Sequence, residues 1–132
     1  MIVVNDMENE SQSQVRILLV DDDDDLRYTM AEYLNQMGFD VVLASDGDEA
    51  LELFNKMKMD VVISDVRMPR MSGIKLLRHV KSLSPKLPMI LMTGFELSQR
   101  DLANIRYNAD AYVTKPFSLA FMKKTIDNLL KK

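Results

Sequence analysis

ILLVDDDDDLR, residues 17 to 27, runs four apolar residues directly into five consecutive aspartates. Neighbouring carboxylates repel one another, so a run of this length is typical of a solvated tail or loop. Here the run follows an apolar segment of the kind that forms a buried strand. The junction therefore predicts a strand whose C-terminal end carries several negative charges.

Short apolar runs alternate along the whole chain with segments of helical periodicity. The expected strands are residues 15–20, 40–44, 60–64, 87–92 and 111–114. The expected helices are residues 26–37, 46–58, 72–82, 98–107 and 118–131. Nearly continuous Val, Ile and Leu runs are typical of strands buried on both faces, and helices of this length can connect parallel strands. The sequence therefore predicts a doubly wound α/β fold, a single (βα)5 domain with a parallel five-stranded sheet.

Length and composition fit one domain with one core, because the chain has 132 residues, of which 47% are hydrophobic and 28% charged. We expect residues 1–14 to be a flexible polar lead-in and residues 15–132 to form the domain. The absence of cysteine excludes disulfides, thiolate metal sites and cysteine nucleophiles.

Charge and hydropathy narrow the expected partners and location. The net charge of −3 gives no general electrostatic reason to expect nucleic acid as a partner. The start of the chain lacks the basic and long apolar regions of a signal peptide, and no run of about 18 apolar residues occurs. We therefore expect a cytoplasmic protein that binds no membrane.

Ligands of a doubly wound sheet bind beyond the C-terminal ends of the strands. The polar residues expected at that edge are Asp21 to Asp25, Asp65, Thr93 and Lys115. Asp21 and Asp22 are expected beside Asp65, and three crowded carboxylates are tolerated only if a cation neutralises them. Oxygen ligands without His or Cys indicate a hard cation, with Mg²⁺ as the expected occupant. Asp23 or Asp24 is instead placed to cap the following helix.

Four segments in this order and spacing resemble a known family: VDDDDDLR (20–27), SDVRMP (64–69) followed by Ser72 and Gly73, MTG (92–94) and VTKPF (113–117). They resemble the receiver domain of two-component response regulators, and the resemblance covers residues of about 15 to 130. It implies a flavodoxin-like fold with strand order 2-1-3-4-5.

The resemblance also implies roles for the acidic residues. Asp65 matches the phosphoacceptor, the carboxylate that takes a phosphoryl group from the phosphohistidine of a partner and becomes a phosphoaspartate. Asp21 and Asp22 match the acidic pair that holds Mg²⁺ or Mn²⁺. Asp65 and the backbone carbonyl of Arg67 would complete the protein ligands of the ion.

The remaining site residues are implied in the same way. Lys115 matches the lysine whose ammonium pairs with the phosphoryl oxygens, and Pro116 resembles the cis proline that follows it in the family. Thr93 matches the hydroxyl that turns toward the phosphoryl group. Tyr112 matches the aromatic residue that moves with it as part of the switch.

A receiver domain is a regulatory phosphoacceptor, which catalyses only its own phosphorylation and slow dephosphorylation. The implied partner is a sensor histidine kinase or a phosphotransfer protein. In the family the last two helices and the last strand form the output or dimer face, here residues of about 96 to 131. We expect the output domain or target to lie outside this chain, and no direct binding of nucleic acid by this domain.

Three other classes compete with this interpretation. A flavodoxin-like cofactor binder would carry a phosphate-binding loop rich in Ser, Thr and Gly where this chain has aspartates. A haloacid-dehalogenase-type phosphatase would use Asp21 as its nucleophile, with Asp23 completing a DxD motif. A pseudo-receiver acting only as an interaction module is disfavoured because no site residue is missing. The phosphorylated residue discriminates, since it is Asp21 in the phosphatase and Asp65 in the receiver.

Two positions bear on how long the phosphoaspartate lasts. Arg67 and Phe95 lie two residues beyond Asp65 and Thr93, and their bulk could shield the phosphoryl group from water. We expect a moderately long-lived phosphorylated form. His79 is expected on the solvent side of its helix rather than as a phosphohistidine.

Overall fold

The computed structural model describes residues 14–94 and 97–131. The lead-in expected at residues 1–14 lies outside the described residues except for Gln14, and so does Phe95. The strands are β1 (Arg16–Val20), β2 (Asp40–Ala44), β3 (Val61–Asp65), β4 (Met89–Thr93) and β5 (Ala111–Thr114). The helices are α2 (Asp24–Gln36), α3 (Gly47–Lys56), α4 (Gly73–Leu83), α5 (Gln99–Asn108) and α6 (Leu119–Leu130).

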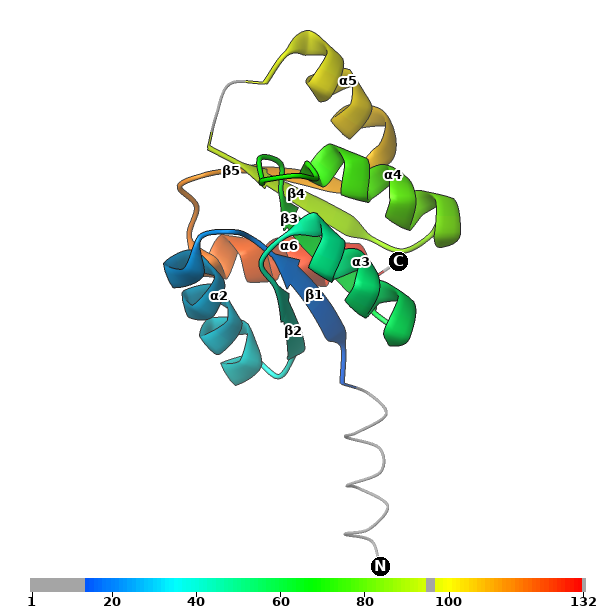
Figure 1. Ribbon diagram of the computed structural model, residues 1–132. Helices are drawn as coiled ribbons and strands as arrows, with labels where there is room; N and C mark the ends of the chain where they lie inside the picture. Colours follow the sequence, from blue (N-terminus) through cyan, green and yellow to red (C-terminus); the bar gives the residue numbers. More distant parts are fainter. Residues whose placement is uncertain (1–13, 95–96, 132) are drawn as a thin grey trace, which may run out of the picture.

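The five strands form one parallel sheet in the order β2-β1-β3-β4-β5 (Figure 1). Helices α2 and α6 cover one face, and α3, α4 and α5 cover the other, as the two buried apolar clusters show. This arrangement confirms the predicted doubly wound (βα)5 fold and the strand order that the family resemblance implied. Among the described residues, no helix is both long and apolar enough to cross a membrane.

The central strands are buried on both faces, which explains their continuous apolar runs. Alternate residues of a strand point to opposite faces, so Leu18 packs with α3 and α4 whereas Leu19 packs with α2 and α6. All residues of β3 and β4 are buried. The last residue of each of these strands is polar, and these residues are Asp65 and Thr93. The packing of the strands therefore places two polar side chains at the buried rim of the sheet.

Each helix begins with a short polar residue whose side chain accepts a hydrogen bond from a backbone N–H of the first turn. These caps are Asp23, Asp46, Ser72, Ser98 and Ser118. The expectation that Asp23 or Asp24 caps the second element is confirmed for Asp23, and α2 begins two residues earlier than the pattern predicted. Strand β3 ends one residue later than predicted, because Asp65 still pairs with Met92 of β4.

Candidate functional site

The carboxyl ends of β1, β3, β4 and β5 meet at one edge of the sheet, as parallel strands require. A pocket of about 540 Å³ opens at this edge. Its lining residues are Asp22, Asp23, Asp65, Arg67, Met68, Pro69, Gly94 and Lys115. The loops after β1, β3, β4 and β5 all contribute, so residues far apart in the sequence share one small space.

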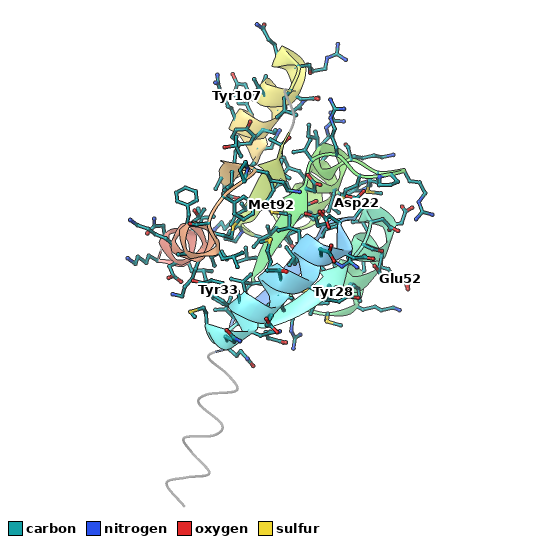
Figure 2. All side chains as sticks on the ribbon, turned by 90° about the vertical axis from the view of Figure 1, so that its left-hand side faces the viewer. Asp22, Tyr28, Tyr33, Glu52, Met92 and Tyr107 are labelled. Atoms are coloured by element: carbon teal, nitrogen blue, oxygen red, sulfur yellow. The ribbon has the colours of Figure 1, made fainter. Side chains whose placement is uncertain are left out.

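Three carboxylates gather at this pocket, as predicted. One oxygen each of Asp21, Asp22 and Asp65 lies within 4.8 Å of the others. Asp21 is fully buried and Asp65 is 5% exposed, whereas Asp22, labelled in Figure 2, is open to solvent. The Asp23 backbone N–H donates to Asp21 Oδ1 at 2.9 Å, which fixes the Asp21 carboxylate against the turn that leads into α2.

The ammonium group of Lys115 faces this cluster. Its Nζ donates to Asp21 Oδ2 at 3.0 Å and to Asp65 Oδ2 at 3.3 Å. Its backbone N–H donates to the Thr93 carbonyl at 2.7 Å, and the Lys115–Pro116 peptide bond is cis, as expected. Burial lowers the pKa of Lys115, but the hydrogen bonds and charges of Asp21 and Asp65 outweigh it and leave the pKa raised. Lys115 is therefore held as an ammonium at neutral pH.

Asp65 sits in an electrostatically unfavourable position. Burial raises its pKa above the ordinary 3.8, the charge of Lys115 opposes this, and the neighbouring charge of Asp21 adds to it, so that the pKa is raised overall. Among the described residues, Asp65 Oδ1 is the buried side-chain atom that lacks a hydrogen-bond partner. A buried, unpaired carboxylate oxygen beside two other carboxylates has the character of a ligand atom for a cation or a reacting atom.

The loop after β3 is packed tightly onto the backbone of Asp65. A Cβ added at Gly73 would overlap the Asp65 carbonyl oxygen, so no larger side chain fits there without movement of the backbone. The Gly73 N–H donates to the Val66 carbonyl at 2.8 Å, and Ser64 Oγ donates to the Asp65 carbonyl at 2.9 Å. These contacts fix the backbone of Asp65 and therefore the direction of its carboxylate.

Arg27 belongs to the site although the sequence analysis did not single it out. Its guanidinium is buried and donates to the Asp21 carbonyl and to Asp24 Oδ1, both at 2.6 Å. Arg27 thus neutralises part of the aspartate run and ties the end of β1 to α2. The signal in the sequence was the spacing of Asp24 and Arg27, since residues three apart on a helix are neighbours.

The two residues predicted to act as the switch are placed differently. Thr93 is buried at the end of β4, whereas Tyr112 is 40% exposed and lines a different pocket beside Pro116 and Phe121. Tyr112 pairs with Leu91 in the sheet, and alternate residues share a face, so Tyr112 and Thr93 lie on the same face two positions apart. Tyr112 therefore adjoins the carboxylate site through Thr93 and does not line it.

The donor set fits a hard divalent cation. The cluster offers carboxylate oxygens only, one of them buried without a partner, and its pocket leaves room for water and a phosphoryl group. Arg67 lines the same pocket, which is compatible with the predicted use of its backbone carbonyl. His79 is exposed on α4, as expected.

Residues 17–127 match the sequence model of the response regulator receiver domain. Among curated proteins, the transcriptional regulatory protein RprY of Bacteroides fragilis is 32% identical over 123 residues, which cover 93% of this chain and 52% of RprY. The chain thus spans about half the length of such relatives, since the response regulator MprA of Mycobacterium sp. is also covered over 51% of its length.

Solved structures of similar size superpose over most of the chain. The chemotaxis protein CheY4 of Vibrio cholerae matches with a TM-score of 0.82 and 31% identity, covering 89% of this chain and 99% of CheY4. The response regulator TrrA of Thermotoga maritima, solved in complex with Mg²⁺ and BeF, matches with a TM-score of 0.80 and 32% identity, covering 88% of this chain and 99% of TrrA.

Proposed function

The chain belongs to the family of response regulator receiver domains of two-component systems, and on that basis we propose that it is a cytoplasmic signalling switch phosphorylated on Asp65. Receiver domains are regulatory phosphoacceptors rather than classical enzymes. The observation that carries the proposal is the Asp65 carboxylate, buried at the pocket with Oδ2 on Lys115 and Oδ1 without a partner. The phosphoryl donor is the phosphohistidine of a sensor histidine kinase or a phosphotransfer protein.

In the proposed reaction an oxygen of Asp65 attacks the phosphorus atom of the donor. The bond between phosphorus and the imidazole nitrogen breaks, its electron pair stays on the nitrogen, and the product is an aspartyl phosphate. Only the ionised carboxylate is a nucleophile, so the reaction needs cations that oppose the raised pKa of Asp65. Lys115 is one such cation, and its ammonium, bound to Asp65 before transfer, is placed to pair with the oxygens of the incoming phosphoryl group.

Mg²⁺ or Mn²⁺ is the proposed cofactor of this reaction. Asp21, Asp22, Asp65 and the Arg67 carbonyl would hold the ion, which would supply positive charge to the phosphoryl oxygens when bound. Asp21 is fixed for this role by the Asp23 N–H and by Lys115. The crowding of three carboxylates around the pocket is the observation that supports a divalent ion over a single ammonium.

We propose that phosphorylation is read out through Thr93 and Tyr112. The new phosphoryl oxygens accept a hydrogen bond from the Thr93 hydroxyl, and the shift of Thr93 changes the space open to Tyr112 on the same face of the sheet. The surface affected would be that of residues about 96 to 131, which includes α5, β5 and α6. Exposed aromatic side chains on it, such as Tyr107 (Figure 2) and Phe121, suit a homodimer, output domain or target protein.

The burial of Asp21 favours Asp65 over Asp21 as the nucleophile. Both Asp21 oxygens are hydrogen-bonded and the residue is fully buried, whereas Asp65 has an oxygen without a partner. Asp23, the second aspartate of the phosphatase motif, lines the pocket as well, but its Oδ1 accepts a hydrogen bond from the Leu26 backbone N–H and caps α2. A moderately long-lived phosphorylated form is also proposed, because the exposed Arg67 lines the pocket and can hinder water.

Intact-mass measurement after incubation with Mg²⁺ and acetyl phosphate tests the proposal. We expect the wild type to gain one phosphoryl group per chain. This gain should be absent in Asp65→Asn, in Lys115→Met and in excess EDTA. The matched control is Asp25→Asn, which should keep the gain because Asp25 is an exposed residue of the same aspartate run. A phosphoryl group that persists in Asp65→Asn but not in Asp21→Asn would identify the phosphatase instead. A phosphorylated form that decays within seconds at neutral pH would contradict the proposed lifetime.

A further inference from the structure

The loop after β3 contains a backbone conformation that is rare for residues other than glycine. Arg70 has a φ of 68°, and the Met71 backbone N–H donates to the Pro69 carbonyl at 2.7 Å, so the three residues form a γ-turn centred on Arg70. A γ-turn with positive φ is strained, and such a turn persists where surrounding contacts hold it. The phosphorylation chemistry proposed above assigns no role to Arg70.

Two contacts hold this turn against the start of α3. Arg70 Nη2 donates to Asp46 Oδ2 at 2.7 Å and forms an ion pair with it. The Met71 side chain is buried against Gly47, where a Cβ would lie 2.7 Å from Met71 Cβ. We call these two contacts, Arg70 with Asp46 and Met71 with Gly47, the α3 clasp. Consecutive residues of the turn are therefore held by the same end of one helix.

Asp46 is a fixed anchor for the α3 clasp. Its Oδ1 accepts the Glu49 backbone N–H at 2.8 Å and so caps α3, while its Oδ2 accepts from Arg70. Two residues earlier in the chain, the Ala44 carbonyl accepts the backbone N–H of Asp21 at 3.2 Å. The short segment that ends β2 and starts α3 is therefore joined both to a proposed metal ligand and to the loop after β3.

The α3 clasp acts on the part of the loop that lines the phosphorylation pocket. The base of the loop is fixed by hydrogen bonds from the Val66 N–H to the Met92 carbonyl at 2.9 Å and from the Gly73 N–H to the Val66 carbonyl at 2.8 Å. Arg67 lines the pocket three residues before Arg70. We propose that Arg70 is a positioning residue, which through the α3 clasp keeps the Arg67 carbonyl within reach of the Mg²⁺ site. This inference rests on the proposed function, because it concerns the same metal site.

Calorimetric titration with Mg²⁺ tests this role on the full chain. Arg70→Asn removes the ion pair but keeps a residue that tolerates positive φ, and it should raise the Kd for Mg²⁺ about three- to fivefold, the scale of one exposed ion pair. Asp46→Asn keeps a cap for α3 without the charge and should have the same effect. The double variant should bind no more weakly than either single variant, because both remove one interaction. Arg70→Lys should restore part of the affinity.

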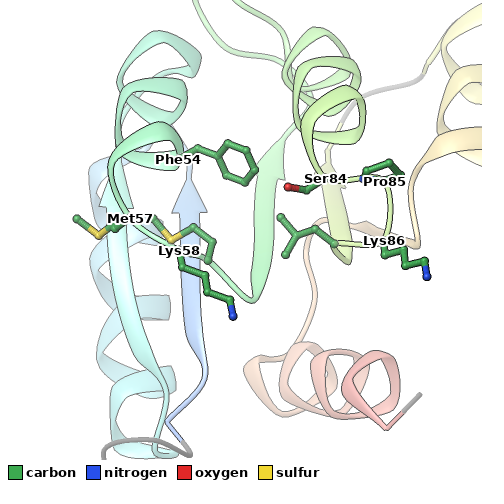
Figure 3. Close-up of a pocket in the computed structure, with 8 residues that line it drawn as sticks. Phe54, Met57, Lys58, Ser84, Pro85 and Lys86 are labelled. Atoms are coloured by element: carbon green, nitrogen blue, oxygen red, sulfur yellow. The ribbon is translucent and has the colours of Figure 1, made fainter.

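The matched control is Lys56→Asn, which breaks an exposed ion pair with Glu52 near the end of α3. Phe54, in the same part of α3, lines a pocket at the opposite edge of the sheet from the metal site (Figure 3). Lys56→Asn should therefore leave the Kd for Mg²⁺ unchanged. The Tm of every variant is measured in EDTA. A lower Tm of Arg70→Asn with an unchanged Kd would make the α3 clasp purely structural and overturn the proposal.

Amide hydrogen exchange in EDTA provides a readout without metal. The Gly73 N–H closes the loop onto Val66, so its exchange should be about three- to fivefold faster in Arg70→Asn and unchanged in Lys56→Asn. Unchanged exchange in Arg70→Asn would also overturn the proposal. The same Kd for Mg²⁺ in all variants, with the wild type phosphorylated on Asp65, would refute the role of Arg70 alone. A wild type that binds no Mg²⁺ would refute the metal site and this role with it.

Discussion

Replacing the proposed phosphoacceptor should make the protein more stable when divalent metal is removed. Asp65 is 5% exposed, its pKa is raised by burial, and one of its oxygens has no hydrogen-bond partner. In Asp65→Asn the side chain keeps nearly the same shape but loses its charge. Lys115 is not left without a counterion, because its Nζ still pairs with Asp21 at 3.0 Å.

The size of this effect follows from the distances. At an effective dielectric constant of about 20, attraction to Lys115 at 3.3 Å favours the Asp65 charge by about 5 kcal/mol. Repulsion from Asp21, with oxygens within 4.8 Å, opposes it by about 3.5 kcal/mol, and the exposed Asp22 adds a smaller repulsion. The charges therefore nearly cancel, and the cost of burying the carboxylate decides the sign. We expect Asp65→Asn to raise the free energy of unfolding by about 1–3 kcal/mol, or about 4–12 °C in Tm.

Urea and thermal unfolding in EDTA at pH 7 measure this difference, with Glu32→Gln as the control because Glu32 is an exposed carboxylate of α2.

The stability difference between Asp65→Asn and the wild type should depend on pH with a defined sign. The carboxyl of Asp65 favours the folded state most below its ordinary pKa of 3.8, and this contribution is lost as pH rises through the raised pKa. The advantage of Asp65→Asn over the wild type should therefore shrink as pH falls below 7. Destabilisation by Asp65→Asn in EDTA would refute the electrostatic account of the site.

Three further perturbations probe the same site. Mg²⁺ at a hundred times its Kd should raise the free energy of unfolding of the wild type by about 2.7 kcal/mol. At the same Mg²⁺ concentration Asp22→Asn should reduce this stabilisation and the control Asp25→Asn should not. Equal stabilisation of all three proteins would argue against the carboxylate cluster as the metal site. Arg27→Met should lower the Mg²⁺ affinity measured by calorimetric titration by about tenfold, because Arg27 hydrogen-bonds the backbone carbonyl of the proposed ligand Asp21 and removing such supporting groups typically weakens metal binding to this extent. An unchanged affinity would limit Arg27 to a role in packing. Gly73→Ala should lower the free energy of unfolding by about 2 kcal/mol, because the added Cβ would overlap the Asp65 carbonyl oxygen. In the control Gly94→Ala the added Cβ meets Lys115 at an ordinary 3.5 Å, so the free energy of unfolding should fall much less.

Sequence patterns predicted the features that depend on strand order and strand ends. Asp21, Asp65 and Lys115 each follow or end a strand, and parallel topology alone brings such residues to one edge. Their proximity was therefore predicted, whereas the hydrogen bonds from Lys115 to Asp21 and Asp65 were found only in the structure. The order of the strands came from family resemblance, since apolar runs specify burial but not which strand is neighbour to which.

Features that depend on packing between elements were not predictable in the same way. The sequence analysis assigned no role to Arg27, and its two 2.6 Å hydrogen bonds identify it as part of the acidic turn. Tyr112 was placed in the correct strand, but its exposure and its separation from the carboxylates depend on how α5 and α6 cover β5. The pocket lined by Phe54 and Leu87 (Figure 3) has no sequence motif, because the end of α3 and the loops after α3 and α4 form it together.

The most direct test of the account is to locate the phosphoryl group. The wild-type protein is incubated with Mg²⁺ and acetyl phosphate, the aspartyl phosphate is reduced with borohydride, and the peptides are sequenced by mass spectrometry. The account predicts homoserine at position 65 and at no other aspartate. Homoserine at position 21, with Asp65 intact, would contradict it.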